Sequence, residues 1–231
     1  LLARGFLVEG REGRALVRHE SSFYVDRSVY KLDLDRSVCQ ERFMTKTKTK
    51  SAAPARERIL ETAKRLFYRN GIRATGIDTI IAEAGVAKMS FYNNFPSKDD
   101  LVRAFLAARH EAWMATFSGR VEKQLAERGL AALAFALDEW FSEPDFRGCA
   151  FINTVAEFGQ EFEGAMRHKV ELEEYVQGIA VRLGLSAPGR VAGEAMVVIE
   201  GAIVRAQMGF RDGLRDQAIS LLQSIERGSR G

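Results

Sequence analysis

The most constraining feature of this 231-residue sequence is a helical periodicity that begins near Pro54 and continues almost to its end. Between Pro54 and Asn70, apolar residues recur every three or four positions and charged residues fill the opposite face, which is typical of an amphipathic helix. The same spacing recurs along the rest of the chain, and no hairpin or strand–helix–strand pattern interrupts it. We therefore expect an all-α protein of about nine helices.

Capping and turn residues mark where these helices begin and end. Pro54 suits a first helical turn, and Gly71 ends that helix. Thr75 and Asp78 have the spacing of a capping box and predict a short helix through Ala84, after which Gly85 supplies a tight turn. A second short helix is expected over 87–95, and Ser97 with Asp100 forms another capping box that opens a long helix. Further helices are expected over 124–142, 148–163, 165–184, 188–209 and 212–227.

Composition narrows the class of protein. With 28% charged and 46% apolar residues, the chain has the make-up of an ordinary globular protein, and its two cysteines cannot supply a disulfide framework or a four-thiolate zinc site. No apolar run approaches the roughly 18–20 residues that a spanning helix needs. Charged residues interrupt every apolar stretch near Leu1, so no signal-peptide pattern is present. We expect a cytoplasmic protein without cofactor, metal or membrane contact.

Charge is distributed unevenly along the chain. Residues 1–43 carry 8 basic and 7 acidic side chains (+1), residues 44–101 carry 11 and 6 (+5), and residues 102–231 carry 15 and 18 (−3), which together give +3. A compact basic segment ahead of a slightly acidic one suggests that one part of the chain contacts a polyanion. A solvated charged face is the plainer alternative.

Residues 1–53 differ from the rest. The chain begins with Leu1, the first methionine is Met44, and the lysine-rich run 45–50 follows it. We hypothesise that Met44 is the natural start and that 1–53 is a disordered extension ending in a basic arm, which the intact mass of the natively expressed protein would test. The expected domain boundaries then divide the rest of the chain into 54–100 and 101–231.

Two short helices joined by a glycine turn and packed on an amphipathic helix form a helix-turn-helix. The first short helix is expected to bury Ile77, Ile80 and Ile81 against Leu66 and Phe67. The second needs apolar anchors on one face and short polar side chains toward base edges on the other. Its expected anchors are Val86, Phe91 and Phe95, and its expected exposed set is Lys88, Met89, Ser90, Tyr92 and Asn93.

Residues 71–101, which read GIRATGIDTIIAEAGVAKMSFYNNFPSKDDL, resemble the DNA-binding signature of the TetR family of transcriptional regulators. The resemblance covers roughly 54–101; beyond it only the helical layout and length agree. Two positions depart from the family pattern: Ile81 stands where alanine is usual, and Ala87 stands where a serine or threonine often caps the recognition helix. The resemblance implies a DNA-binding transcriptional regulator, most often a repressor, and no enzyme.

The resemblance also implies roles for individual residues. Contacts to phosphates are expected from Thr75, Thr79, Tyr92 and Lys98, and contacts to base edges from Lys88, Met89, Ser90 and Asn93. Lys46, Lys48 and Lys50 would follow the DNA backbone and add affinity with little sequence information. Tyr92 is alternatively a packing residue, and Thr75 alternatively only caps its helix.

A single helix-turn-helix reads few base pairs, so specific binding to a palindromic operator usually needs a homodimer that spans half-sites about 34 Å apart. In the TetR family the last two helices typically form a four-helix bundle across the dimer axis. The residues expected at that interface are Val191, Ala195, Val198, Ala202, Leu214, Ala218, Leu221 and Leu222. Ordinary core within one chain is the alternative.

The helices between these two parts are rich in aromatic residues, a pattern more often found in a core than in a pocket. In the TetR family, however, the equivalent helices surround the cavity for a small-molecule effector, whose binding favours a wide spacing of the recognition helices. The expected pocket residues are Trp113, Phe117, Phe151, Asn153, Glu157 and Phe158. Cys149 is either a thiol sensor or a buried inert cysteine.

Two other classes of function remain as alternatives. An enzyme or metal site would have to use the lone pair His168 and Glu171, whereas a di-iron bundle needs two such motifs and further carboxylates. A helical adaptor would leave the +5 charge of residues 44–101 unexplained. Absence of binding to the promoter DNA beside the protein's own gene, even at low salt, would favour the adaptor.

Overall fold

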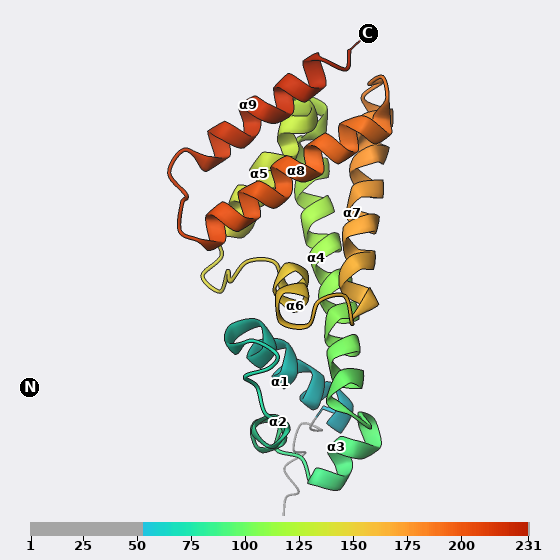
Figure 1. The fold of residues 1–231 in the computed structure, drawn as a ribbon, viewed down its shortest axis with the longest axis vertical. Helices are drawn as coiled ribbons and strands as arrows, with labels where there is room; N and C mark the ends of the chain where they lie inside the picture. The colour runs from blue at the N-terminus through green and yellow to red at the C-terminus, as the bar shows by residue number, and fades with distance from the viewer. Residues whose placement is uncertain (1–52, 231) are drawn as a thin grey trace, which may run out of the picture. The chain divides into compact units, whose positions relative to one another are not determined.

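The computed structural model describes residues 53–230, and within them the chain forms nine α-helices and one short 3-10 turn, with no strand. The all-α prediction is confirmed (Figure 1). The helices are α1 (Ala55–Asn70), α2 (Ile77–Ala84), α3 (Lys88–Asn94), α4 (Lys98–Arg128), α5 (Ala132–Phe141), α6 (Ala150–Phe158), α7 (Glu163–Arg182), α8 (Pro188–Gln207) and α9 (Leu214–Arg227), with the turn η1 (Gly129–Ala131) between α4 and α5. Met44, Lys46, Lys48 and Lys50 lie outside the described residues.

Helices α1–α3 pack around a small apolar centre, and we call them the reading head. Ile80 of α2 and Phe91 of α3 have no exposed surface, and Phe67 of α1 is 3% exposed. Ile77 and Ile81 are partly buried against the same centre. The sequence therefore anticipated which face of each short helix turns inward.

Helix α4 joins the reading head to the remaining helices, which with α4 we call the helical body. Ser97 caps α4, because its hydroxyl accepts a hydrogen bond from the backbone N–H of Asp100 at 3.1 Å, as the capping box predicts. Phe105 meets Phe67 of α1 edge-on at 5.5 Å between ring centroids. In Figure 1, α4 continues from there past α6 to the level of α5.

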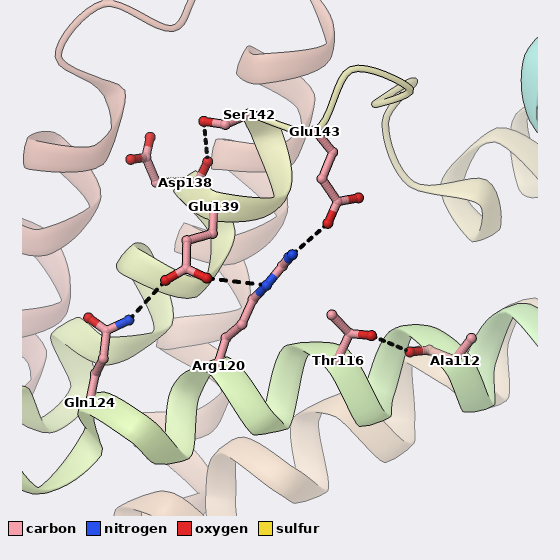
Figure 2. Close-up of polar contacts among 8 residues, drawn as sticks. All are labelled: Ala112, Thr116, Arg120, Gln124, Asp138, Glu139, Ser142 and Glu143. Atoms are coloured by element: carbon pink, nitrogen blue, oxygen red, sulfur yellow. Dashed lines mark hydrogen bonds and ion pairs between the residues drawn. The ribbon is translucent and has the colours of Figure 1, made fainter.

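In the helical body, α5 is buried on nearly every side, because it packs on α4, α8 and α9. Figure 2 shows how Arg120 of α4 ties down the exposed edge of α5. Its Nε lies 3.3 Å from Oε2 of Glu139, and a terminal nitrogen lies 2.6 Å from Oε1 of Glu143. Gln124 donates to the same Glu139 at 3.3 Å.

No helix among residues 53–230 is both long enough and apolar enough to cross a bilayer.

Three local predictions are wrong. The helix expected over 124–142 is divided, because α4 runs on to Arg128 and η1 precedes α5. The helix expected over 148–163 ends at Phe158, since Gly159 takes φ +64°, a conformation outside the helical range. The capping box at Thr75 does not form: α2 begins after Gly76 without a side-chain cap.

Candidate nucleic-acid interface and regulatory junction

Helix α3 presents one polar face to solvent. Met89 is 71% exposed, Lys88 and Asn93 are exposed beside it, and Ser90 is half-buried. On the opposite face Phe91 is fully buried, and the ring of Tyr92 packs edge-on against it at 5.3 Å. The short helix is therefore held by its aromatic side and leaves its polar side free.

The turn before α3 is fixed by Gly85. This residue has φ +61° and ψ +43°, a left-handed conformation that permits the predicted tight turn. Its carbonyl accepts a hydrogen bond from the guanidinium of Arg58 at 3.1 Å. Lys88 at the start of α3 lies 3.7 Å from the carboxylate of Asp78 on α2. Both side chains are largely exposed, so this ion pair leaves Lys88 available to another anion.

The residues expected to contact phosphate are placed unequally. Thr79 and Tyr92 are exposed, whereas Thr75 is 3% exposed and donates its hydroxyl hydrogen bond to the carbonyl of Gly71 at 2.7 Å. Thr75 thus stabilises the connection before α2 and offers no free hydroxyl, which contradicts its expected role at phosphate. Lys98 is half-buried, and burial lowers the pKa of its ammonium, although the Glu157 carboxylate opposes that effect.

Glu157 lies at the junction between the reading head and the helical body. Its carboxylate accepts hydrogen bonds from the backbone N–H groups of Ile72, at 3.1 Å, and Arg73, at 2.6 Å. These two groups belong to the connection after α1, whose N–H donors have no helical partner there. A charged acceptor on α6 therefore holds the reading head directly.

Tyr68 of α1 makes a second tie across the junction. Its hydroxyl donates to the carbonyl of Gly148 and accepts from the N–H of Arg147, both at 3.0 Å. Burial raises the pKa of this phenol, so it stays protonated and keeps its donor role at neutral pH. No sequence pattern indicated this tie, since its partners are 79 and 80 residues away.

A cavity of about 260 Å³ opens beside these ties. We call it the junction cavity; its walls include Tyr68, Phe105, Asn153, Glu157 and Gln207. Gln207, the last residue of α8, donates to the side-chain oxygen of Asn153 at 3.0 Å. The junction cavity therefore borders α1, α4, α6 and the end of α8.

The six residues expected to form one effector pocket do not come together. Asn153 and Glu157 line the junction cavity, but Trp113 and Phe117 stack on each other at 4.6 Å within the core. Phe151 stacks on His168 at 3.7 Å, and the cavity that both residues line together with Trp113 is only about 10 Å³, too little for a ligand. Phe158 packs edge-on against Phe162 at 5.2 Å. Cys149 is buried at the edge of the same aromatic core.

His168 belongs to that core as well, and the partly buried His110 lies beside it. His110 of α4 has Nδ1 3.0 Å from Nδ1 of His168 and Nε2 2.8 Å from a carboxylate oxygen of Glu171, so it bridges the predicted His168–Glu171 pair. Burial lowers the pKa of His168 to about 3, and Lys169 adds to the effect. Within residues 53–230, no three side chains of the metal-ligating types gather in a metal-binding arrangement.

Most residues expected at a dimer interface are core residues of the single chain. Those with 5% exposure or less are Val191, Ala195, Ala202, Leu214, Ala218 and Leu222. Val198 is half-buried, and only Leu221 is substantially exposed, at 55%. The expectation is wrong for the buried six, because the periodicity identified the side of α8 and α9 that faces their own helical body.

A different side of α8 carries the exposed apolar residues. Val197 is 73% exposed, Val204 41% and Met208 66%, and their spacing of seven and then four residues puts them in one row. Gly201 lies in the same row. We call this row the apolar stripe; Leu221 of α9 is a further exposed apolar residue. The stripe escaped notice in the sequence because α8 has apolar residues on two sides.

Comparison with known proteins agrees with this architecture. The model of the bacterial regulatory proteins of the tetR family matches residues 59–105. The chain is 33% identical over 81 residues to the uncharacterized HTH-type transcriptional regulator YxaF of Bacillus subtilis, which is 35% of this chain and 38% of that protein. It is 35% identical over 68 residues to the HTH-type transcriptional regulator TtgR of Pseudomonas putida, 29% and 32% of the two chains. These matches span little more than a third of the relatives.

Solved structures extend the likeness to the helical body. A TetR-family transcriptional regulator from Streptomyces coelicolor superposes with a TM-score of 0.70 at 26% identity and covers 78% of this chain and 91% of its own. A TetR transcriptional regulator from Chloroflexus aurantiacus shares the fold, with a TM-score of 0.61 at 22% identity over 74% and 93% of the chains. The reading head thus matches the model of the tetR family of bacterial regulatory proteins, and the helical body has the fold of solved TetR-family regulators.

Proposed function

We propose that this protein is a homodimeric transcriptional repressor that binds a palindromic operator and leaves it when a small-molecule effector binds. The observation that carries the proposal is the polar, solvent-facing side of α3, supported from behind by the buried Phe91. A helix that presents polar side chains on a rigid three-helix unit fits the major groove of DNA.

The proposed DNA contacts divide into two groups. Base edges are read by Lys88, Met89, Ser90 and Asn93 of α3. Phosphates are bound by Tyr92 on the same helix and by Thr79 and Lys98, which flank it. The run with Lys46, Lys48 and Lys50 adds electrostatic affinity. Ala87 precedes α3 without a side-chain cap, so the hydroxyl contact that many family members make there is missing.

The homodimer is proposed to form through the apolar stripe. Isolated exposed apolar residues are common, but a row of large ones along a single helix face favours a protein partner. A second copy of the same chain is the partner that provides the second reading head. Gly201 within the row supports close approach of the paired α8 helices.

Effector release is proposed to act through the junction. Glu157 and Tyr68 hold the reading head, and the junction cavity lies directly beside both side chains. A ligand there competes with or strengthens these ties, and so favours one position of the reading head over another.

Binding-site selection from random double-stranded DNA, followed by electrophoretic shift on the selected site, tests the proposal. We expect a palindromic consensus and a complex containing two chains. Failure to enrich any sequence at low salt would contradict operator binding and favour a helical adaptor.

A further inference from the structure

A second groove lies beside the junction cavity and shares Tyr68 and Phe105 with it. Its volume is about 490 Å³, within the range of small-molecule sites. We call it the arginine groove, since five of its wall residues are cationic and one is acidic. The cations are Lys64, Arg65, Arg69, Arg109 and Arg147, and the acid is Asp145.

Two of the five cations have a carboxylate partner on their own side of the groove. Lys64 pairs with Glu61 at 2.8 Å, and Arg65 pairs with Glu83. In the described part of the chain, Arg69, Arg109 and Arg147 form no ion pair with any carboxylate, Asp145 included. The groove thus gathers three uncompensated guanidinium groups.

Two of these arginines are held in place rather than loosely solvated. The guanidinium carbon of Arg109 lies 4.2 Å from the centroid of the Tyr68 ring. Arg147 is fixed through its backbone, whose N–H donates to the Tyr68 hydroxyl, and its side chain donates to the carbonyl of Phe146 at 2.8 Å. Tyr68 therefore contacts both arginines, and all three residues line the arginine groove.

Like charges held close together repel each other, and an anion placed between them relieves that repulsion. Guanidinium groups suit carboxylates and phosphates because they offer paired N–H donors in a planar fork. Phe105 and Pro144 give the same groove an apolar wall. We propose that the arginine groove binds a small aromatic acid, with its phosphate or carboxylate on Arg69, Arg109 and Arg147 and its ring toward that wall.

The position of the groove gives the anion a regulatory consequence. Arg69 belongs to α1, Arg109 to α4, and Arg147 to the connection between α5 and α6. A bound anion therefore bridges the reading head and the helical body next to the Tyr68 tie. This consequence rests on the proposed function, whereas binding of the anion does not.

Calorimetric titration of the full chain without DNA tests the site. The probes are phenyl phosphate, inorganic phosphate and phenol at one fixed ionic strength. We expect phenyl phosphate to bind at least about tenfold more tightly than inorganic phosphate, and phenol not to bind measurably. Arg109→Gln and Arg147→Gln should each weaken phenyl phosphate binding by about tenfold or more. Circular dichroism and thermal unfolding show whether each variant is folded.

Arg227→Gln is the matched control, since Arg227 is an exposed arginine of α9, away from the groove, and its loss changes the net charge equally. Equal loss of binding in the control, or equal affinity for phenyl phosphate and inorganic phosphate, would overturn the site. The site is also overturned if the groove variants lose DNA affinity but keep phenyl phosphate affinity, because the groove is then part of the DNA surface. Phenyl phosphate binding that leaves operator affinity unchanged sustains the site and contradicts effector release through it.

Discussion

Single residues carry the connection between reading head and helical body. Each carboxylate oxygen of Glu157 accepts a hydrogen bond from a backbone N–H, so the junction uses both oxygens of this charged group. An amide in its place keeps one acceptor and turns an NH₂ group toward the other donor.

Glu157→Gln should therefore loosen the junction without unfolding the protein. Losing the acceptor of a partly buried N–H costs about 1–3 kcal/mol locally. Hydrogen exchange at Ile72 and Arg73 should become faster, while exchange in α5 stays unchanged. Glu161→Gln removes the same charge from an exposed position and should leave both amides as protected as before. Unchanged exchange in Glu157→Gln would contradict the tie.

His168 makes stability depend on pH. Its pKa is about 3 in the folded protein because it is buried, and about 6.5 in an unfolded chain. Between these values only the unfolded chain takes up the proton, so the free energy of unfolding falls as pH falls below about 6.5.

Urea unfolding at pH 7.0 and pH 5.5, at one protein concentration, measures this effect. Between pH 7.0 and pH 5.5, the free energy of unfolding of the wild type should fall by about 1 kcal/mol more than that of the His168→Gln variant. The comparison uses the change with pH, so any constant cost of the substitution cancels. The same loss in both proteins would show that His168 is not the titrating group.

At the scale of single helices, α3 and the first turn of α4 have different proposed tasks. Lys98→Ala should weaken binding to all DNA sequences about equally and lower the salt slope by about one unit, because a phosphate contact carries no sequence information. Lys88→Ala and Asn93→Ala should also change the selected sequence, and removing each base-edge interaction should weaken operator binding by about 1–3 kcal/mol.

Fluorescence anisotropy on operator and random DNA at several salt concentrations separates these outcomes. Lys123→Ala, on an exposed part of α4 within the helical body, serves as the control for net charge. If all three variants lost the same affinity on both DNAs, the division into base and phosphate contacts would be wrong.

A charge placed in the apolar stripe of α8 should weaken the proposed dimer, whereas a charge on an exposed face of α7 should not. Val204→Glu places a carboxylate in the apolar stripe and should raise the dimer dissociation constant by about a hundredfold or more, because that charge is desolvated without a partner. Val181→Glu, at a valine near the end of α7 that is more exposed than Val204, should leave the dimer intact. Sedimentation velocity measures both, and a dimeric Val204→Glu protein would exclude the stripe as the interface.

The sequence predicted the positions of the helices well. It predicted less well which side of each helix is buried and which distant residues meet. Periodicity correctly anticipated the burial of Ile80 and Phe91, because each short helix has one apolar side. It misassigned α8, where Val191 and Val197 lie on different sides and only the packed structure shows which side the chain covers itself. The junction was not predictable at all, since Glu157 meets Ile72 across 85 residues without any local pattern.

At the scale of the whole molecule, the net charge of a segment does not describe every surface to which that segment contributes. The helical body belongs to a segment with a formal charge of −3 (15 basic and 18 acidic residues), yet it contributes Arg109 and Arg147 to the strongly cationic arginine groove. The polyanion and the small anion would then bind to different parts of one protein. Their influence on each other has to be reciprocal: an anion that weakens operator binding is itself bound more weakly when the operator is occupied.

The two ties at the junction also limit how the reading head can move. Glu157 and the Tyr68 hydroxyl grip the last turn of α1 and the residues just after it, so the far end of α1 and all of α3 are free of them. If the reading head rotates as a rigid unit about these two ties, a small displacement at the ties becomes a larger displacement at α3. A ligand that displaces either tie should therefore move α3, the helix proposed to contact base edges, more than it moves the last turn of α1.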